Sequence, residues 1–313
     1  MPVLPYNDLN TYLRRRFGCR VQKITIDAGL SCPNRDGTLS TGGCIYCNER
    51  GSGTGAHGRL GIAEQIQSAR DNLSKRYKAC KYIAYFQSFT NTYGPVETLR
   101  SLYEEALAQD GIVGLIIGTR PDCVGDDVLD MIAGFAKETW VTVEYGLQSV
   151  HDETLERINR GHTFAAFRDA VERTRARGID VGVHVILGLP GETKADMLET
   201  ARVLGGMDIQ GIKIHLLYIV RGTKLHEMHE SGAYTCLTRE EYVDIVCEFV
   251  ALLPPSMIIH RLTGDPHPGE LVAPAWALEK QINLEAIRSE MERRGVRQGG
   301  DCGKKERRYC KLF

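Results

Sequence analysis

Three cysteines in one glycine-rich loop have the chemistry to hold a metal centre. Cys32, Cys44 and Cys47 lie in the stretch ITIDAGLSCPNRDGTLSTGGCIYCNERGSG, residues 24–53, directly after a short apolar run. Thiolate is a soft ligand that iron–sulfur clusters and zinc both favour. No fourth cysteine lies nearby, and three ligands suit a [4Fe–4S] cluster with one open iron. A structural zinc site normally has four ligands, which His57 would complete, so zinc stays an alternative.

The same loop resembles the cluster-binding loop of radical S-adenosylmethionine enzymes. The resemblance rests on CPNRDGT, which begins at Cys32, and on GGCIYCN, in which the aromatic Tyr46 precedes the last cysteine. Most members of that superfamily space the cysteines C-x3-C-x2-C, whereas eleven residues separate Cys32 from Cys44 here. This longer insertion is similar to that of an uncharacterised bacterial branch close to the Elongator catalytic subunit. Later segments match in order over nearly the whole chain.

The resemblance implies a complete set of cofactors. Cys32, Cys44 and Cys47 would hold three irons of a [4Fe–4S] cluster, and the fourth iron would bind the amino and carboxylate groups of S-adenosyl-L-methionine (SAM). One electron, from a donor such as flavodoxin or ferredoxin, would then cleave the sulfonium. The adenosyl radical would abstract a hydrogen from the substrate. The protein itself positions these groups and excludes water and oxygen.

Polar segments that follow two predicted strands resemble the cofactor contacts of the superfamily. After the second strand the implied contacts to the methionine part are Gln87, Ser88, Thr90 and Asn91. After the fourth strand, segments like ExGxQS and RINRGH supply Glu144, Gln148, Ser149 and Arg160. An arginine fork suits this role, because it clamps a carboxylate with two hydrogen bonds. Taken without the resemblance, Asn, Ser and Thr also favour ordinary turns, and an arginine is usually a surface residue.

His184 is the candidate catalytic residue. It lies in an otherwise apolar predicted strand that leads into Gly188-Leu-Pro-Gly191, which resembles the adenine-binding segment of the superfamily. A single histidine among apolar residues is more often a core residue, and a role as acid, base or hydrogen-bond partner is open. Gly188 is implied to let the backbone approach the cofactor. The Elongator-like pattern has Glu where this chain has Gly118, so that carboxylate contact does not carry over.

Alternating apolar strands and amphipathic helices must position these residues. Strands are predicted at 23–26, 81–86, 112–117, 140–145, 181–187 and 212–220. Such alternation predicts right-handed βαβ units, an α/β fold and a parallel sheet. Six units are too few for a closed eight-stranded barrel, so we expect a partial (β/α)6 TIM-type barrel, as in the superfamily. Every segment singled out follows the carboxyl end of a strand, where such barrels place their chemistry, which independently indicates an enzyme.

Three regions are expected along the chain. Residues 1–22 are predicted to be a helical lead-in, residues 23–253 the barrel, and residues 254–313 a C-terminal extension that is a candidate substrate cap. The extension is expected to contain a strand at 257–261, a loop at 264–275 and a helix that ends at residue 294. Its basic end carries Cys302 and Cys310, and two thiols alone do not complete a metal site.

Composition limits the classes of function. A 313-residue chain with 42% hydrophobic residues can bury a large core. A formal net charge of −1 provides no general attraction to nucleic acid, so RNA binding would need a local basic patch. Ten cysteines and a start, MPVLPYNDLN, without an export signal predict a reducing, cytoplasmic location. No segment approaches the roughly 20 apolar residues of a membrane span, so no membrane partner is expected.

The expected macromolecular partner is tRNA. The resembled Elongator subunit acts on wobble uridine, and basic clusters at 14–23 and 304–311 have the charge to contact phosphates while an extruded base enters the barrel. The near-neutral net charge argues against tight RNA binding. No acetyltransferase domain is expected after residue 254, so a different radical step on an already modified uridine is favoured. The alternative from another class is a zinc-stabilised, RNA-binding barrel without redox chemistry.

Overall fold

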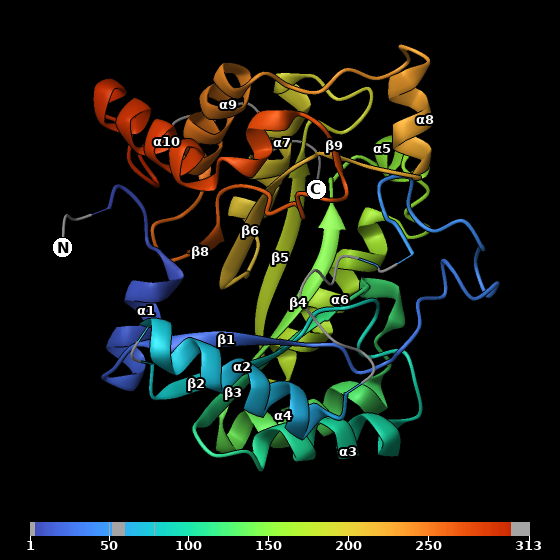
Figure 1. The fold of residues 1–313 in the computed structure, drawn as a ribbon, viewed down its shortest axis with the longest axis vertical. Helices are drawn as coiled ribbons and strands as arrows, with labels where there is room; N and C mark the ends of the chain where they lie inside the picture. The colour runs from blue at the N-terminus through green and yellow to red at the C-terminus, as the bar shows by residue number, and fades with distance from the viewer. Residues whose placement is uncertain (1–3, 50, 52–59, 78, 302–313) are drawn as a thin grey trace.

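A single curved sheet of parallel strands forms the centre of the computed structural model, which describes residues 4–49, 51, 60–77 and 79–301. In the order β1-β2-β3-β4-β5-β6-β8, the strands are Val21–Ile26, Lys81–Phe86, Ile112–Thr119, Trp140–Gln148, Asp180–Leu187, Gly211–Leu216 and Ile258–Arg261. All neighbours pair in parallel. The predicted α/β partial barrel of TIM type is confirmed. Its seventh strand, β8, comes from the C-terminal extension, and the sheet is open between β1 and β8 (Figure 1).

Helices connect the strands, and most of them cover the outer face of the sheet. They are α1 Leu9–Phe17, α2 Ile62–Tyr77, α3 Val96–Leu107, α4 Asp126–Glu138, α5 Asp152–Arg157, α6 Phe164–Ala176, α7 Lys194–Gly205, α8 Lys224–Glu230, α9 Arg239–Leu252 and α10 Lys280–Arg294. Two short 3-10 helices span Pro121–Cys123 and Ala275–Leu278. In Figure 1, α2, α3 and α4 lie beside β1 to β3, and α7, α9 and α10 lie beside β5 to β8. Within the described ranges, no helix has the length and apolar character to cross a membrane.

Side-chain caps begin three of the predicted helices. Thr163 accepts a hydrogen bond from the amide of Ala166 at the start of α6. Thr193 and Thr238 form full capping boxes at the starts of α7 and α9, because the third helical residue also reaches back to the cap amide. These caps satisfy amides that have no partner inside the helix. These three threonines therefore fix where the helices begin.

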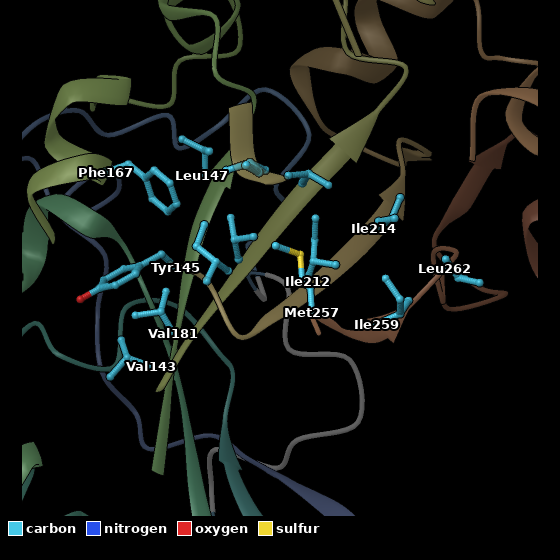
Figure 2. Packing of buried hydrophobic residues seen from close by; sticks show 14 of the residues in the cluster. Val143, Tyr145, Leu147, Phe167, Val181, Ile212, Ile214, Met257, Ile259 and Leu262 are labelled. Atoms are coloured by element: carbon cyan, nitrogen blue, oxygen red, sulfur yellow. The ribbon is translucent and has the colours of Figure 1, made fainter. Parts of the chain in front are cut away.

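Alternate residues of the inner strands face the helices and the barrel interior. Val143 and Tyr145 of β4 are buried under α6, where the ring centroids of Tyr145 and Phe167 lie 6.2 Å apart (Figure 2). Successive side chains of a strand point to opposite faces. Glu144, between them, therefore faces the barrel interior, and Lys213 in β6 does so between two buried isoleucines. The interior of the barrel is consequently polar around Glu144 and Lys213, while the outer face of these strands is apolar.

The prediction of one strand over 212–220 is wrong. The parallel ladder between β5 and β6 ends at the pair Leu187 and Leu216. Residues Ile219–Val220 instead form β7, which pairs antiparallel with β9, Leu271–Ala273. β5 ends at Leu187 and offers no further residue for pairing, so the chain beyond β6 joins a second sheet. The same pairing places a short strand inside the predicted loop 264–275. The helices α5 and α8 lie in segments for which no element was predicted.

The helix predicted to end at residue 294 is confirmed as α10. Ile282 on this helix is 51% exposed. The buried side of α10 carries Asn283, Ile287 and Met291 instead. Asn283 donates a hydrogen bond from Nδ2 to the carbonyl of Trp276 at 2.9 Å, which lets a polar side chain occupy the buried face.

α1 covers the amino-terminal end of the barrel. Leu9 and Leu13 belong to a buried cluster with Val21 and Trp140, the first residues of β1 and β4. The cysteine loop instead follows the carboxyl end of β1 (Figure 1). The arginines 14–16 of α1 therefore lie at the opposite end of the barrel from the cysteines.

Candidate active site

Backbone hydrogen bonds fold the cysteine loop into a compact turn. The amides of Arg35 and Asp36 donate to the carbonyl of Cys32 at 2.8 and 3.1 Å. The amide of Cys47 donates to the carbonyl of Cys44 at 2.9 Å. The eleven residues between the first two cysteines are thus folded back on themselves. As a result all three thiols line one cavity despite their unequal spacing.

A glycine allows this loop to pass close to an arginine. Gly43 has φ +69°, and a Cβ atom there would lie 3.0 Å from Nε and Nη2 of Arg35. The same Nη2 donates to the carbonyl of Cys47 at 2.6 Å. A side chain at position 43 would therefore be strained and would push away the arginine that holds the last cysteine.

The segment 157–162 clamps the loop from the other side. Asn34 Nδ2 donates to the carbonyl of Asn159 at 2.6 Å, and Asn159 Nδ2 donates to the carbonyl of Gly43 at 2.7 Å. Asn159 adopts φ +52°, a conformation that asparagine tolerates better than most residues. Asn34 Nδ2 also lies 3.6 Å from the sulfur of Cys44. The two asparagines therefore connect the cysteine loop to the RINRGH segment.

Arg160 lies directly against the cysteines. Its Nε and Nη2 donate to the carbonyl of Gly146 at 3.0 and 2.6 Å, and its Nη1 lies 3.7 Å from the sulfur of Cys44. A Cβ atom on Gly146 would come within 2.8 Å of Nη2, so glycine is required for this approach. The carbonyl of Arg160 accepts a 2.7 Å bond from Arg120, whose guanidinium also pairs with Asp122. The segments 119–122 and 157–162 thus position each other.

The cavity beside these residues has a volume of about 330 Å³ and extends into the barrel. It is lined by ten of the residues singled out from the sequence, namely Cys32, Cys44, Tyr46, Cys47, Gln87, Thr90, Glu144, Gln148, Arg160 and His184. The tertiary structure therefore brings together residues from four strands and their loops. Their individual roles stay predictions.

Four other candidate residues do not line the cavity. Ser88 and Asn91 are buried, and Asn91 Nδ2 donates to the carbonyls of Ser88 and Gly118 at 3.1 and 2.8 Å. Ser149 donates to the carboxylate of Glu192. The carbonyl of Gly188 accepts a 2.7 Å bond from the hydroxyl of Tyr234. These side chains and backbone groups support the loops around the cavity. The alternative zinc ligand His57 lies outside the described residues.

The donor set fits an iron–sulfur cluster and a polar ligand. Thr90 Oγ1 is buried, has no hydrogen-bond partner, and belongs to a residue that lines the cavity. In the described part of the chain, no three His, Cys, Asp or Glu side chains converge on one metal ion. A zinc ion needs convergent ligands, whereas each thiolate of a cluster binds a different iron. The three thiols at this cavity therefore fit an iron–sulfur cluster, whose thiolate ligands each bind a different iron.

A second polar group occupies the interior of the barrel. The fully buried carboxylate of Glu144 accepts hydrogen bonds from Lys213 Nζ at 2.5 Å, His184 Nε2 at 2.8 Å and His260 Nδ1 at 2.9 Å. Lys213 Nζ also lies 2.6 Å from the hydroxyl of Tyr85. Burial by itself raises the pKa of Glu144, but the charge of Lys213 and the histidine hydrogen bonds hold it well below its usual range. Glu144 is therefore ionised and saturated by protein partners.

His184 is neutral at physiological pH. Burial, followed by the charge of Lys213, lowers its pKa to about 4, although the bond to Glu144 opposes this shift. Other groups that face it are His215 and the nearby Arg261. With Nε2 donating to Glu144, its Nδ1 carries no proton in the neutral ring. The side chain is therefore suited to accept a hydrogen bond at Nδ1 rather than to donate an acidic proton.

This lowered pKa predicts acid lability. An unfolded His184 binds a proton below pH 6.5, whereas the folded one does so only near pH 4, so its stabilising contribution is lost as the pH falls through this window. We expect the free energy of unfolding to fall by about 2 kcal/mol from this residue alone between pH 8 and pH 5. Urea denaturation at both pH values checks the prediction. His184→Asn should show a smaller loss than the wild type, and an equal loss would contradict the assignment.

Family models supply the decisive comparison. Residues 37–204, more than half of the chain, match the model of the Radical SAM superfamily. Residues 209–293 match the Radical_SAM C-terminal domain. The chain belongs to the radical SAM superfamily. This radical SAM enzyme therefore comes from a family that uses SAM and a [4Fe–4S] cluster.

Relatives of this radical SAM chain fall into two groups. It is 44% identical to the protein YtqA of Bacillus subtilis, over 94% of this chain and 92% of that protein. It is 29% identical to the tRNA uridine(34) acetyltransferase of Dehalococcoides mccartyi, over 55% of this chain but only 37% of that protein. Among solved structures, Elp3 of Methanocaldococcus infernus covers 89% of this chain and 64% of its own, with a TM-score of 0.68 and 17% identity. At that identity the last likeness concerns the fold.

Several residues of this radical SAM site were not singled out in the sequence. Asn34, Arg35 and Arg120 orient the cysteine loop and its clamp, and Arg120 is fully buried. Lys213 and His215 line the interior of the cavity. The alternation of β6 offered a signal, because polar residues at 213 and 215 share one face of an otherwise apolar strand. No local pattern links them to Glu144 on β4.

Proposed function

We propose that Cys32, Cys44 and Cys47 of this radical SAM enzyme ligate the [4Fe–4S] cluster, with SAM bound beside it. The observation that carries the proposal is that the three thiols share one cavity with Arg160 and an unpartnered Thr90 hydroxyl. When bound, and given one electron from a donor such as flavodoxin or ferredoxin, these cofactors supply a carbon radical that removes a hydrogen atom from the substrate.

Arg160 is the proposed anchor for the carboxylate of SAM. A guanidinium has five N–H groups, and three of them are directed to Gly146 and Cys44. Two remain for a ligand, and the existing bonds hold the fork rigid before the ligand arrives. Thr90 and Gln148 offer further polar contacts to the methionine part. Gln148 adopts φ +85°, a costly conformation for a non-glycine residue that is typical of functional sites.

The proposed substrate is a uridine side chain in tRNA. The support is the likeness to a relative named as a tRNA uridine(34) acetyltransferase. Because this chain spans only about a third of that relative, acetyl transfer is not carried over. A different radical step, on an already modified uridine, is proposed instead. The base would have to be extruded from the RNA to enter the barrel.

The RNA contacts must differ from those first expected. Arginines 14–16 lie on α1, which covers the end of the barrel opposite the cysteine loop. They are poorly placed to hold phosphates while a base occupies the cavity. The basic residues 304–311 lie outside the described part of the chain. Six residues of the C-terminal extension line the cavity, which supports its proposed role as a substrate cap: Arg261, Asp265, Pro266, His267, Glu270 and Leu271.

Nucleoside analysis tests the substrate proposal. Deleting the gene should remove one modified uridine from tRNA hydrolysates and leave a precursor nucleoside that is detectable by mass spectrometry. Complementation with the wild-type gene should restore the product, whereas the Cys44→Ala gene should not, because it lacks a cluster ligand. A nucleoside profile identical to that of the parent strain would refute tRNA as the substrate and leave the radical chemistry untouched.

A further inference from the structure

The cavity has a second, cationic side inside the barrel. Besides the cysteines it is lined by Lys213 and His215 of β6 and by Arg261 of β8. Lys213 is the register partner of both His184 on β5 and Arg261 on β8. These side chains come from the strands themselves, whereas the cysteines come from the loop beyond β1. One cavity therefore joins the candidate cluster site to a group of basic residues that the proposed chemistry does not use.

The carboxylate of Glu144, which lines the cavity together with Asp265 and Glu270, is already satisfied. Glu144 accepts hydrogen bonds from Lys213, His184 and His260. Glycines on neighbouring strands make room for this arrangement. A Cβ atom on Gly182 would lie 2.9 Å from Cγ of Glu144, and one on Gly211 would lie 2.5 Å from Nε2 of His260. The network is therefore built into the sheet, and its carboxylate has little capacity left to neutralise further cations.

Basic residues outnumber acidic ones in the lining of the cavity, where five arginines and lysines face three carboxylates. Glu144 pairs with Lys213, whose pKa is held well below its usual range by burial and by the nearby Lys23 and Arg261, although the charge of Glu144 opposes this shift. The acidic partner of Arg261 is Asp265, at 3.6 Å, and the same carboxylate oxygen is 2.6 Å from Lys280. This oxygen is thus shared between two cations. An anion from outside the protein would complete the charge balance.

An unpartnered histidine nitrogen lies at the same place. His215 Nε2 is buried and has no hydrogen-bond partner. Its ring centroid is 5.2 Å from that of His184. Burial, and then the nearby His184, Arg261 and Lys213, hold its pKa well below the usual range, so the ring is neutral. A buried polar atom without a partner is costly, and the neutral tautomer protonated at Nε2 would offer a donor to a ligand.

We propose that Lys213, His215 and Arg261 form a subsite for one oxyanion group of the substrate. Lys213 directs two of its three donors to Glu144 and Tyr85, which leaves one for a ligand. Arg261 and His215 supply the others from adjacent strands. That this oxyanion belongs to the substrate rests on the proposed function. An oxyanion held here would fix the substrate within the same cavity as the cluster cysteines.

Anion-dependent thermal stability tests the subsite. The SAM-loaded holoenzyme is melted at constant ionic strength in increasing sodium acetate or sodium phosphate, with sodium chloride as the reference. At least one oxyanion should raise the melting temperature of the wild type above the chloride value, because a ligand of the folded state stabilises it. Protection by acetate alone indicates a carboxylate group on the substrate, and protection by phosphate alone indicates a phosphate group.

Variants separate the subsite from general ion effects. Arg261→Gln and His215→Phe should each raise the half-maximal oxyanion concentration about tenfold, as expected for a lost charge-assisted or buried hydrogen bond. Arg168→Gln, an exposed position on α6, should respond like the wild type. Equal protection by chloride, or unchanged oxyanion protection in both variants, would overturn the subsite. Neither result depends on tRNA, so this failure is distinct from an unchanged nucleoside profile.

Discussion

Cys44→Ala is expected to abolish both bound iron and cleavage of SAM. Cys44 is the most enclosed of the three thiols, since it is buried and approached by Asn34 Nδ2 and by Arg160 Nη1. Without it only two thiols remain in the loop, which is too few to hold a [4Fe–4S] cluster. Iron and sulfide content after anaerobic reconstitution, together with the yield of 5′-deoxyadenosine, measures both losses. Cys32→Ala and Cys47→Ala should give the same result.

Cys80→Ala is the matched control. Cys80 is an exposed free thiol that precedes β2, outside the cysteine loop. The Cys80→Ala protein should keep iron near the wild-type amount. The same is expected of Cys247→Ala, because Cys247 lies on the buried side of α9. If Cys80→Ala lost iron as fully as Cys44→Ala, the ligand assignment would be wrong. Metal analysis that found stoichiometric zinc and no iron would favour the zinc-stabilised barrel instead.

Arg160→Ala is expected to keep the cluster and weaken SAM binding by about 1.5–3 kcal/mol, or roughly 10- to 150-fold in Kd. The physical reason is the loss of a charge-assisted hydrogen bond inside a buried site, where water cannot replace the guanidinium. Equilibrium binding of SAM to reconstituted protein, after the iron content has been confirmed, measures the effect. Gln148→Ala should weaken binding less, because it removes a neutral partner.

Arg168→Ala removes the same charge from an exposed position and controls for a general electrostatic effect. Its SAM affinity should equal that of the wild type. Unchanged affinity in Arg160→Ala, with an intact cluster, would remove this residue from the cofactor site. Loss of iron together with affinity would show instead that its contact with the sulfur of Cys44 supports the cluster.

Local patterns in the sequence determined the elements and the site loops. Alternating apolar runs and capping residues such as Thr193 and Thr238 located most helices and strands, because caps and periodicity act over a few residues. The same short range explains the failures. The split between β6 and β7 depends on a pairing with residues 271–273, far along the chain. Which face of α10 is exposed depends on which other elements of the protein pack against this helix.

The candidate cluster site could be predicted from the sequence because its three cysteines lie in one loop and in a recognisable motif. The contacts that clamp the cysteine loop could not be predicted from the sequence, because Asn34 and Asn159, which share a hydrogen bond, are 125 residues apart in the chain. The interior network is still more dependent on the fold. Glu144, Lys213 and His260 stand on three strands and meet only because the parallel sheet curves into a partial barrel. Sequence alone therefore determined the cofactor chemistry, whereas tertiary structure decided which charges surround the substrate cavity, because strand register and sheet curvature bring distant residues into contact.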